Sequence, residues 1–129
     1  MLADYVPIPA IAVKDLARAR AFYEGTLGFS PAGDVPEGVI YPAGNSAFLV
    51  YPSKYAGTNK ATAMSFQVTP DAFDDEVAAL RAKGLSFQTF EIDGLVWDGV
   101  VAIMGDSKAV WFADPDGNIL NVESAQMIT

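Results

Sequence analysis

The sequence predicts an α+β protein made of two copies of one structural unit. Each copy reads as a strand, a helix, a turn and a hairpin, and the two helices are offset by about 55 residues, which is an internal repeat. Both copies reach a Pro-x-Gly-Asn turn, at residues 42–45 and 115–118, that an apolar strand follows. Hydrophobic residues make up 51% of the 129-residue chain, which is ample for one folded core. The repeat therefore constrains the architecture more than local propensity does.

The first helix is predicted from Asp15 to Leu27. Asp15 stands at the N-cap, where its carboxylate can accept hydrogen bonds from the free amides of the first turn. Gly28 suits the left-handed position just beyond the helix end. Apolar residues recur between them at helical spacing, namely Leu16, Ala19, Phe22 or Tyr23, and Leu27.

The second helix is predicted over residues 71–83. Thr69 offers a capping hydroxyl, Pro70 fits the first helical position, and Asp71 faces the positive end of the helix dipole. Gly84 ends the helix. Its apolar stripe consists of Phe73, Val77 and Leu80. The acidic run at residues 74–76 is expected to be a solvated face.

The strands alternate, so each is expected to turn one set of side chains to its helix and the other set to a free concave face. The residues expected on the helix side are Ile11, Val13, Met64, Phe66, Val68, Leu120 and Val122. The residues expected on the free face of the second copy are Ala63, Ser65, Gln67, Asn121 and Glu123. Each copy is thus predicted to be a small twisted sheet with one helix on its back.

The chain is expected to form a single domain of two modules, at about residues 5–52 and 62–125, joined by a polar linker at 53–61. The second module carries extra residues, 91–104, that the first lacks. Trp97 lies there between Gly94 and Gly99, among aspartates. Because loops often carry binding residues, we expect a mobile loop that closes over a ligand.

Composition excludes several classes of function. The net charge of −8 argues against nucleic acid as a partner, because its phosphates would be repelled. The chain has no cysteine and no histidine, so it lacks thiolates and the commonest metal ligand. The longest apolar run is far below the roughly 18 residues of a membrane span. The start of the chain lacks a signal-peptide pattern, so a soluble, cytoplasmic protein is expected, with no membrane partner.

Three segments together resemble the vicinal-oxygen-chelate superfamily, which includes glyoxalase I, extradiol dioxygenases, fosfomycin-resistance enzymes and bleomycin-binding proteins. They are residues 13–23 (Val-Lys-Asp-Leu-Ala-Arg-Ala-Arg-Ala-Phe-Tyr), 27–29 (Leu-Gly-Phe) and 111–118 (Trp-Phe-Ala-Asp-Pro-Asp-Gly-Asn). With the repeat, the resemblance covers essentially the whole chain. It implies two βαβββ modules whose mixed sheets form a concave cup with the helices on the outer face. It also implies a homodimer. Many chemistries share this fold.

The resemblance also implies where metal ligands would lie. In metal-dependent members, His, Gln or Glu side chains on the first and last strand of each module bind the metal. Carried over, these positions fall near Ile8, at Ala63, around Phe48 or Val50, and on Asn121. Glu123, two residues on, could substitute. Because a catalytic divalent ion typically needs three protein ligands, we expect no metal and no cofactor.

The expected ligand is instead a hydrophobic, aromatic small molecule, bound in an apolar cup with a few polar groups. The candidate binding residues are Phe48, Val50, Tyr55, Ala63, Ser65, Gln67, Trp97, Trp111, Asn121 and Glu123. Some admit a second interpretation. Trp111 could pack in the core beside the turn, Tyr55 could be an ordinary loop aromatic, and Glu123 could be a solvated carboxylate. No catalytic residue is assigned.

Three functions fit these residues. The first is a metal-free binding protein of the glyoxalase/bleomycin-resistance type that sequesters a hydrophobic aromatic compound such as an antibiotic. The alternative is a glyoxalase-like lyase or isomerase that uses Glu123 as general base. The third is a regulatory domain without a tight ligand.

Overall fold

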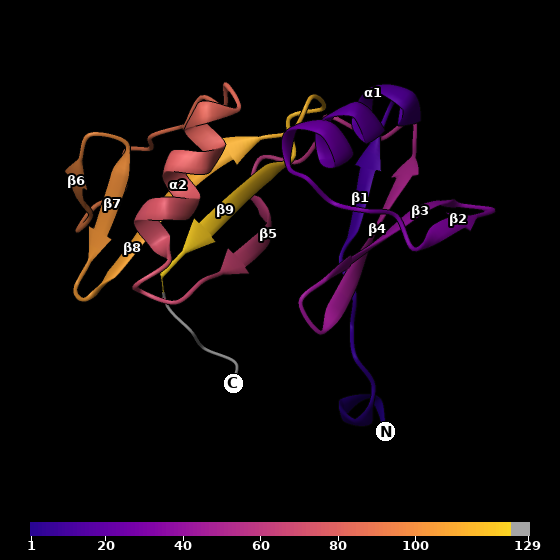
Figure 1. Ribbon diagram of the computed structural model, residues 1–129, viewed down its shortest axis with the longest axis horizontal. Coiled ribbons are helices and arrows are strands. Elements are labelled where there is room, and N and C mark those ends of the chain that lie inside the picture. The colour runs from indigo at the N-terminus through magenta and orange to yellow at the C-terminus, as the bar shows by residue number, and fades with distance from the viewer. Residues whose placement is uncertain (125–129) are drawn as a thin grey trace. The chain divides into compact units, whose positions relative to one another are not determined.

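The computed structural model describes residues 1–124, except the side chains of Leu2 and Asp34, so the predicted end of module two at residue 125 lies outside the described residues. The chain has the predicted α+β fold, with one sheet of four strands and one of five. It divides into two compact units (Figure 1). Unit one comprises Met1–Ala63 and Asp114–Asn118, and unit two comprises Met64–Ala113 and the chain from Ile119 onward. Among the described residues, no helix is both long and apolar enough to cross a membrane.

Unit one follows the predicted order of strand, helix and three further strands. After a short 3-10 helix, η1 (Leu2–Asp4), its elements are β1 (Ala10–Val13), α1 (Leu16–Arg20), η2 (Ala21–Thr26), β2 (Gly33–Val35), β3 (Gly38–Ala43) and β4 (Ser46–Pro52). The sheet order is β1-β4-β3-β2, with β1 parallel to β4 and the other pairs antiparallel.

The first helix begins as predicted and ends differently. The Asp15 carboxylate caps it by accepting from the Arg18 amide at 3.2 Å. After Arg20, however, the chain continues as the π-helix η2 rather than as α-helix to Leu27. Gly25 lies within this wider turn and favours helix weakly, and the Tyr23 hydroxyl is held by Asp114 at 2.9 Å. Gly28 follows with a φ of +82°, the left-handed conformation that was expected.

The core of unit one is aromatic. The Tyr23 ring lies 5.9 Å from that of Tyr41 and 5.7 Å from that of Phe48, centroid to centroid. Phe29 packs edge-on against Phe48 at 5.0 Å. Valines from three strands complete the buried layer, namely Val13, Val39 and Val50.

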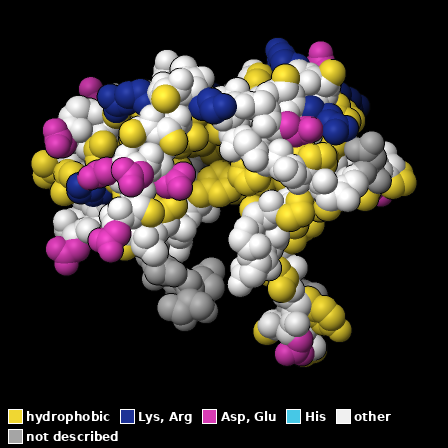
Figure 2. Space-filling model, in the orientation of Figure 1, with side chains coloured by type: hydrophobic (Ala, Val, Ile, Leu, Met, Phe, Trp, Pro, Cys, Tyr) yellow, Lys and Arg dark blue, Asp and Glu magenta, His cyan; other side chains and the backbone are white. Residues whose placement is uncertain are grey.

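The described part of unit two contains one helix and five strands, and the first two residues of the first strand belong to unit one. These elements are β5 (Thr62–Gln67), α2 (Phe73–Ala82), β6 (Val96–Asp98), β7 (Val101–Met104), β8 (Ser107–Ala113) and β9 (Ile119–Glu123). The sheet order is β5-β9-β8-β7-β6. The face covered by α2 carries the buried residues Met64, Val110, Phe112, Leu120 and Val122. Figure 2 shows acidic side chains on the exposed side of α2, where Asp74, Asp75 and Glu76 lie, as the sequence predicted.

Two predictions for unit two are wrong. The helix begins at Phe73, and Ala72 rather than Thr69 is its N-cap. Residues 69–72 form a separate turn in which the Ala72 amide donates to the Thr69 carbonyl at 3.0 Å, so the helix starts one turn later. Residues 91–104 are not simply a loop, because 96–104 fold into the β6–β7 hairpin. Gly99, with a φ of +61°, supplies the tight turn between its two apolar strands.

Candidate functional site

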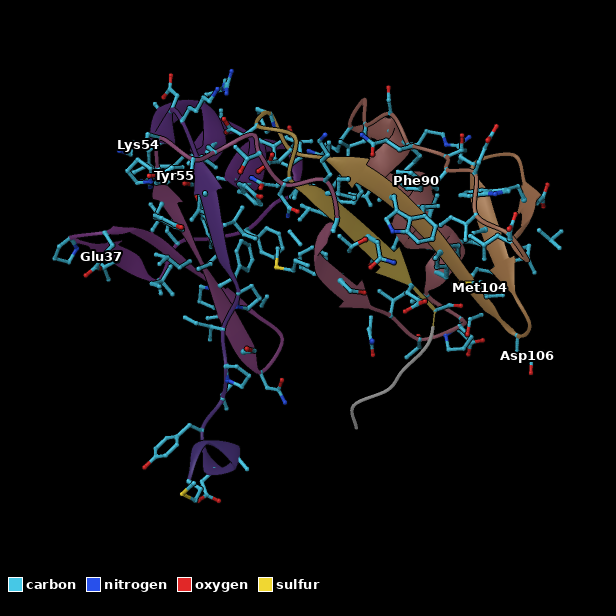
Figure 3. The ribbon with its side chains drawn as sticks, turned by 180° about the vertical axis from the view of Figure 1, so that it is seen from behind. Glu37, Lys54, Tyr55, Phe90, Met104 and Asp106 are labelled. Carbon is cyan, nitrogen blue, oxygen red and sulfur yellow. The ribbon has the colours of Figure 1, made fainter. Side chains whose placement is uncertain are left out.

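Three aromatic side chains meet on the side of the β5–β9 sheet that faces away from α2, which we call the aromatic face. The Trp111 ring lies 5.7 Å from that of Phe90, edge to face, and 6.0 Å from that of Trp97. Figure 3, seen from behind relative to Figure 1, labels Phe90 and Met104 on this side. The two tryptophans singled out in the sequence therefore belong to one cluster.

Strand pairing explains how these rings meet. On β8, Lys108, Val110 and Phe112 face α2, as the 3.7 Å pair between Lys108 Nζ and Asp74 of that helix shows, so Trp111 must face the other way. Trp97 on β6 pairs with Ala102, and Ala102 pairs with Ala109 on β8.

The small side chains of Ala102 and Ala109, both fully buried, allow the Trp97 indole to lie close to Trp111 although β7 separates their strands. Phe90 is brought in by Gln88, whose amide donates to the Trp111 carbonyl at 2.8 Å.

Two polar side chains share the aromatic face. Asn121 on β9 pairs with Trp111, and Glu123 pairs with Ala109. Asn121 is only 5% exposed, and within residues 1–124 its Oδ1 atom has no hydrogen-bond partner. A buried acceptor without a donor costs about 1–3 kcal/mol of folding free energy. Glu123 is partly exposed. An aromatic surface, an unpaired acceptor and a carboxylate are thus held together by one sheet.

The structure corrects the predicted roles of Phe48 and Val50. Both lie on the core side of their sheet, with 1% and 0% of their surface exposed, because Val50 pairs with Ile11 and Phe48 pairs with Tyr41. A strand places alternate residues on opposite faces of its sheet. Assigning Phe48 and Val50 to the face away from the helix therefore places every side chain of β4 on the wrong face. The residues of β4 that face away from this core are Ala47, Leu49 and Tyr51.

The other candidates occupy three places. Ser65 and Gln67 are exposed on β5, where the burial of Met64 confirms the predicted alternation, and Ala63 is partly exposed at its start. Tyr55 belongs to unit one, in the turn after β4, and is 68% exposed. The Lys54 ammonium lies 5.2 Å above the Tyr55 ring centre.

Sequence reasoning missed Phe90. It lies outside the named strands, in a segment that joins the sheet through one bridge, between Gln88 and Trp111. The available signal was the short run Ser-Phe-Gln-Thr-Phe at residues 86–90, which mixes β-forming and aromatic residues two positions after Gly84, the glycine that follows α2.

The side chains of the Asp-Pro-Asp-Gly-Asn turn at residues 114–118 make hydrogen bonds that stabilise the fold. Asp114 Oδ1 accepts from the amides of Asp116 and Asn118, both at 2.9 Å, and Asp114 Oδ2 accepts from the Tyr23 hydroxyl at 2.9 Å. Asp116 Oδ1 accepts from Arg18 Nη2 at 3.0 Å. Burial, and then the charge of Asp114, raises the pKa of the Tyr23 hydroxyl far above its usual value. Three of the four carboxylate oxygens of Asp114 and Asp116 thus hold the turn within unit one, whereas Asp116 Oδ2 is buried without a partner among the described residues.

The residues at the implied metal positions do not fit a metal ion. Ile8 is an exposed apolar side chain, Ala63 has no donor atom, and Phe48 and Val50 lie in the core. Asn121 offers one neutral amide oxygen. Within residues 1–124, no group of three or more acidic side chains is placed to hold a metal. Glu123 alone supplies too few donors beside Asn121.

Comparisons with known proteins agree with this architecture. The sequence model of the Glyoxalase/Bleomycin resistance protein/Dioxygenase superfamily matches residues 5–122. A member of that group from Alicyclobacillus acidocaldarius superimposes with a TM-score of 0.70 at 18% identity, over 93% of this chain and 90% of the other. The fosfomycin resistance protein FosX of Mesorhizobium loti gives 0.68 at 13% identity, over 96% and 94%.

The lactoylglutathione lyase of Agrobacterium tumefaciens gives a TM-score of 0.66 at 19% identity, over 92% of each chain. At such identities these structures show the shared fold alone. No curated protein matches the sequence. The sequence match spans nearly the whole chain, and the chain therefore belongs to the glyoxalase/bleomycin resistance protein/dioxygenase superfamily.

Proposed function

We propose that the protein is a metal-free binding protein that takes up a hydrophobic, aromatic small molecule and so sequesters a compound such as an antibiotic. The observation that carries this proposal is the cluster of Phe90, Trp97 and Trp111 on one sheet face, beside the unpaired Oδ1 of Asn121. Ligand sites of this type combine broad apolar surfaces with a few polar groups that orient the ligand.

The ring geometry supports an aromatic ligand. The Phe90 ring stands at 90° to the Trp111 indole, and the Trp97 ring is tilted by 55° to it. Trp97 and Trp111 both remain partly exposed. Aromatic pairs add about 0.5–1.5 kcal/mol beyond the area that they bury, so a flat ligand gains from each ring it contacts.

The poor donor set at the implied metal positions supports binding rather than metal-assisted turnover. Among fold relatives, the Mesorhizobium loti protein is named for fosfomycin resistance, which fits a role against a toxic small molecule. The alternative, a lyase or isomerase with Glu123 as base, has one observation in its favour: this carboxylate is partly exposed on the aromatic face.

Titration with a planar polycyclic compound, followed by tryptophan fluorescence, tests the proposal. We expect saturable quenching, and we expect Trp97→Ala to weaken binding about tenfold, the effect of losing an interface anchor. Tyr5→Ala is the matched control, because Tyr5 is a 73% exposed aromatic residue of unit one. Unchanged binding by Trp97→Ala would contradict the proposed site.

Elemental analysis of the purified protein tests the metal-free state. One bound equivalent of a transition metal per chain would contradict it.

A further inference from the structure

We infer that the ligand of the aromatic face is a cation, namely a planar aromatic compound whose positively charged group carries N–H donors. This inference rests on the proposed function and adds the charge and the hydrogen-bonding character of the ligand. Three observations carry it: the distribution of charged side chains in unit two, the attraction of aromatic rings for cations, and the missing hydrogen-bond donor at Asn121.

The basic side chains described in unit two lie on the α2 side. Lys108 pairs with Asp74 of α2 at 3.7 Å. Arg81 belongs to α2 and lies 5.7 Å from the ring centre of Phe87, which packs on Phe112 on the same side of the sheet. Lys83 is the C-cap of α2. No described basic residue of unit two therefore projects from the aromatic face to receive an anion.

Negative charge lies on and beside the aromatic face. Pairing across the sheet places Glu123, Ala109, Ala102 and Trp97 in one row, and Asn121, Trp111 and Gln88 in the next. Glu123 thus lies on the same face as both indoles. Glu91 and Asp93 are exposed in the segment that joins Phe90 to β6. An anionic ligand would be repelled here, whereas a cationic one would be attracted.

The rings add to the same preference. A cation over an indole face is attracted by the ring's quadrupole, and tryptophan is the strongest partner of this kind. Two indoles and a phenyl ring therefore favour a positively charged aromatic compound over its neutral analogue of equal size.

Asn121 favours a ligand that carries a hydrogen-bond donor. Its Oδ1 can only accept a hydrogen bond, it is buried, and it has no partner in the described part of the chain. This atom has almost no surface open to solvent, so a ligand N–H group reaches it only when the Asn121 side chain turns toward the ligand. Such a donor would satisfy the oxygen, whereas a ligand without a donor would leave it unpaired. A charged N–H group can therefore donate a hydrogen bond to Asn121 Oδ1 and be attracted by the Glu123 carboxylate.

Four tricyclic probes of similar size separate charge from hydrogen bonding. Proflavine is a cation with N–H donors, N-methylacridinium is a cation without them, acridine is neutral, and anthracene carboxylate is an anion. We expect proflavine to bind at least about tenfold more tightly than acridine, as cation–π attraction and a neighbouring carboxylate would give. N-methylacridinium should fall between them, and anthracene carboxylate should bind most weakly.

Variants assign these preferences to residues. Glu123→Gln should weaken both cations several-fold and leave acridine unchanged. Asn121→Leu should weaken proflavine and leave N-methylacridinium unchanged. Asp75→Asn is the matched control, because it removes one negative charge from the exposed surface of α2 and should change no affinity. If Asn121→Leu fails to fold, Glu123→Gln still decides the question of charge.

Different binding results would contradict the charge of the ligand and the aromatic binding function. If acridine or anthracene carboxylate binds as tightly as proflavine, the inference about charge is wrong and the aromatic binding function stands. If proflavine binds more tightly but Glu123→Gln weakens it no more than Asp75→Asn does, the inference is also wrong. If none of the four probes binds, the proposed function fails with it.

Discussion

Asn121 is a residue whose burial opposes folding. Its Oδ1 atom is buried without a partner among the residues that the structure describes, so an apolar residue of similar size should be better tolerated in the folded protein. We expect Asn121→Leu to raise the free energy of unfolding by about 1 kcal/mol, measured by urea denaturation without ligand. Asn118→Leu is the control, because the Asn118 Nδ2 group donates to the Ala12 carbonyl and to Asp114 Oδ2, both at 2.8 Å. That variant should be destabilised, and a loss of stability in Asn121→Leu as well would contradict the prediction.

Tyr23 should make stability depend on alkaline pH. Its pKa is raised above the ordinary value of 10.0, first by burial and then by the charge of Asp114. Above that ordinary value the unfolded chain loses the phenolic proton while the folded protein keeps it, so folding stability falls as pH rises. We expect Tyr23→Phe to be less stable than the wild type at neutral pH, because its hydrogen bond to Asp114 is lost. The difference should shrink above pH 10.0 in paired denaturation curves. A constant difference would show that Tyr23 ionises equally easily in both states.

Phe48 and Val50 were assigned to the wrong face of β4 because the apolar pattern of this strand does not distinguish its two faces. Both faces of β4 carry apolar side chains, since Ala47, Leu49 and Tyr51 alternate with Phe48 and Val50. Alternation of hydrophobicity therefore could not decide which set meets the helix. The decision comes from long-range packing of Phe48 against Tyr23 and Tyr41. On β9 the pattern Leu-Asn-Val-Glu marks one side as polar, and there the assignment of Leu120 and Val122 to the core was confirmed.

Among the elements, those with capping and repeat signals were the most predictable. Asp15 caps α1 as its sequence context indicated. The start of α2 was misplaced because Thr69, Pro70 and Asp71 suit a turn as well as a helix cap. The sequence predicts a loop where the β6–β7 hairpin lies, because its strands are short and its tryptophan lies between glycines. Pairing with β8 supplies the stability that local propensity lacks.

The β6–β7 hairpin gives a test at this scale. Gly99 has a φ of +61°, and no atom of residues 1–124 lies within 4 Å of a Cβ added there, so Gly99→Ala introduces backbone strain without a clash. We expect a loss of about 1 kcal/mol in hairpin stability and weaker binding of planar ligands, because β6 carries Trp97. Hydrogen exchange of the β6 amides would measure the first effect. Gly25→Ala is the control, since Gly25 has equally free space but no positive φ. Faster exchange in both variants would contradict the argument.

For the whole molecule, we propose a homodimer of about 27 kDa, twice the 13.7 kDa chain, with the closed two-fold symmetry that is commonest among homo-oligomers. Light scattering at micromolar concentration should give the dimer mass, and a monomer mass would contradict it.

The overall fold class was predictable because the repeat, the helix caps and the turn motif agree with one another. The ligand site was less predictable, because Phe90 reaches the cluster through the bridge between Gln88 and Trp111, and the local run at residues 86–90 does not specify that long-range partner.

The membership of Asp114–Asn118 in unit one has a consequence for synthesis on the ribosome. Residues 1–63 leave the exit tunnel first, but the acceptor for the Tyr23 hydroxyl follows about 50 residues later, which is several seconds at roughly 5–20 residues per second. During that delay, burying the Tyr23 phenol as in the finished structure would leave it without its carboxylate partner. The folding of the first unit therefore cannot finish before most of the second unit has been translated, and a nascent chain stalled before residue 114 should remain open to proteases.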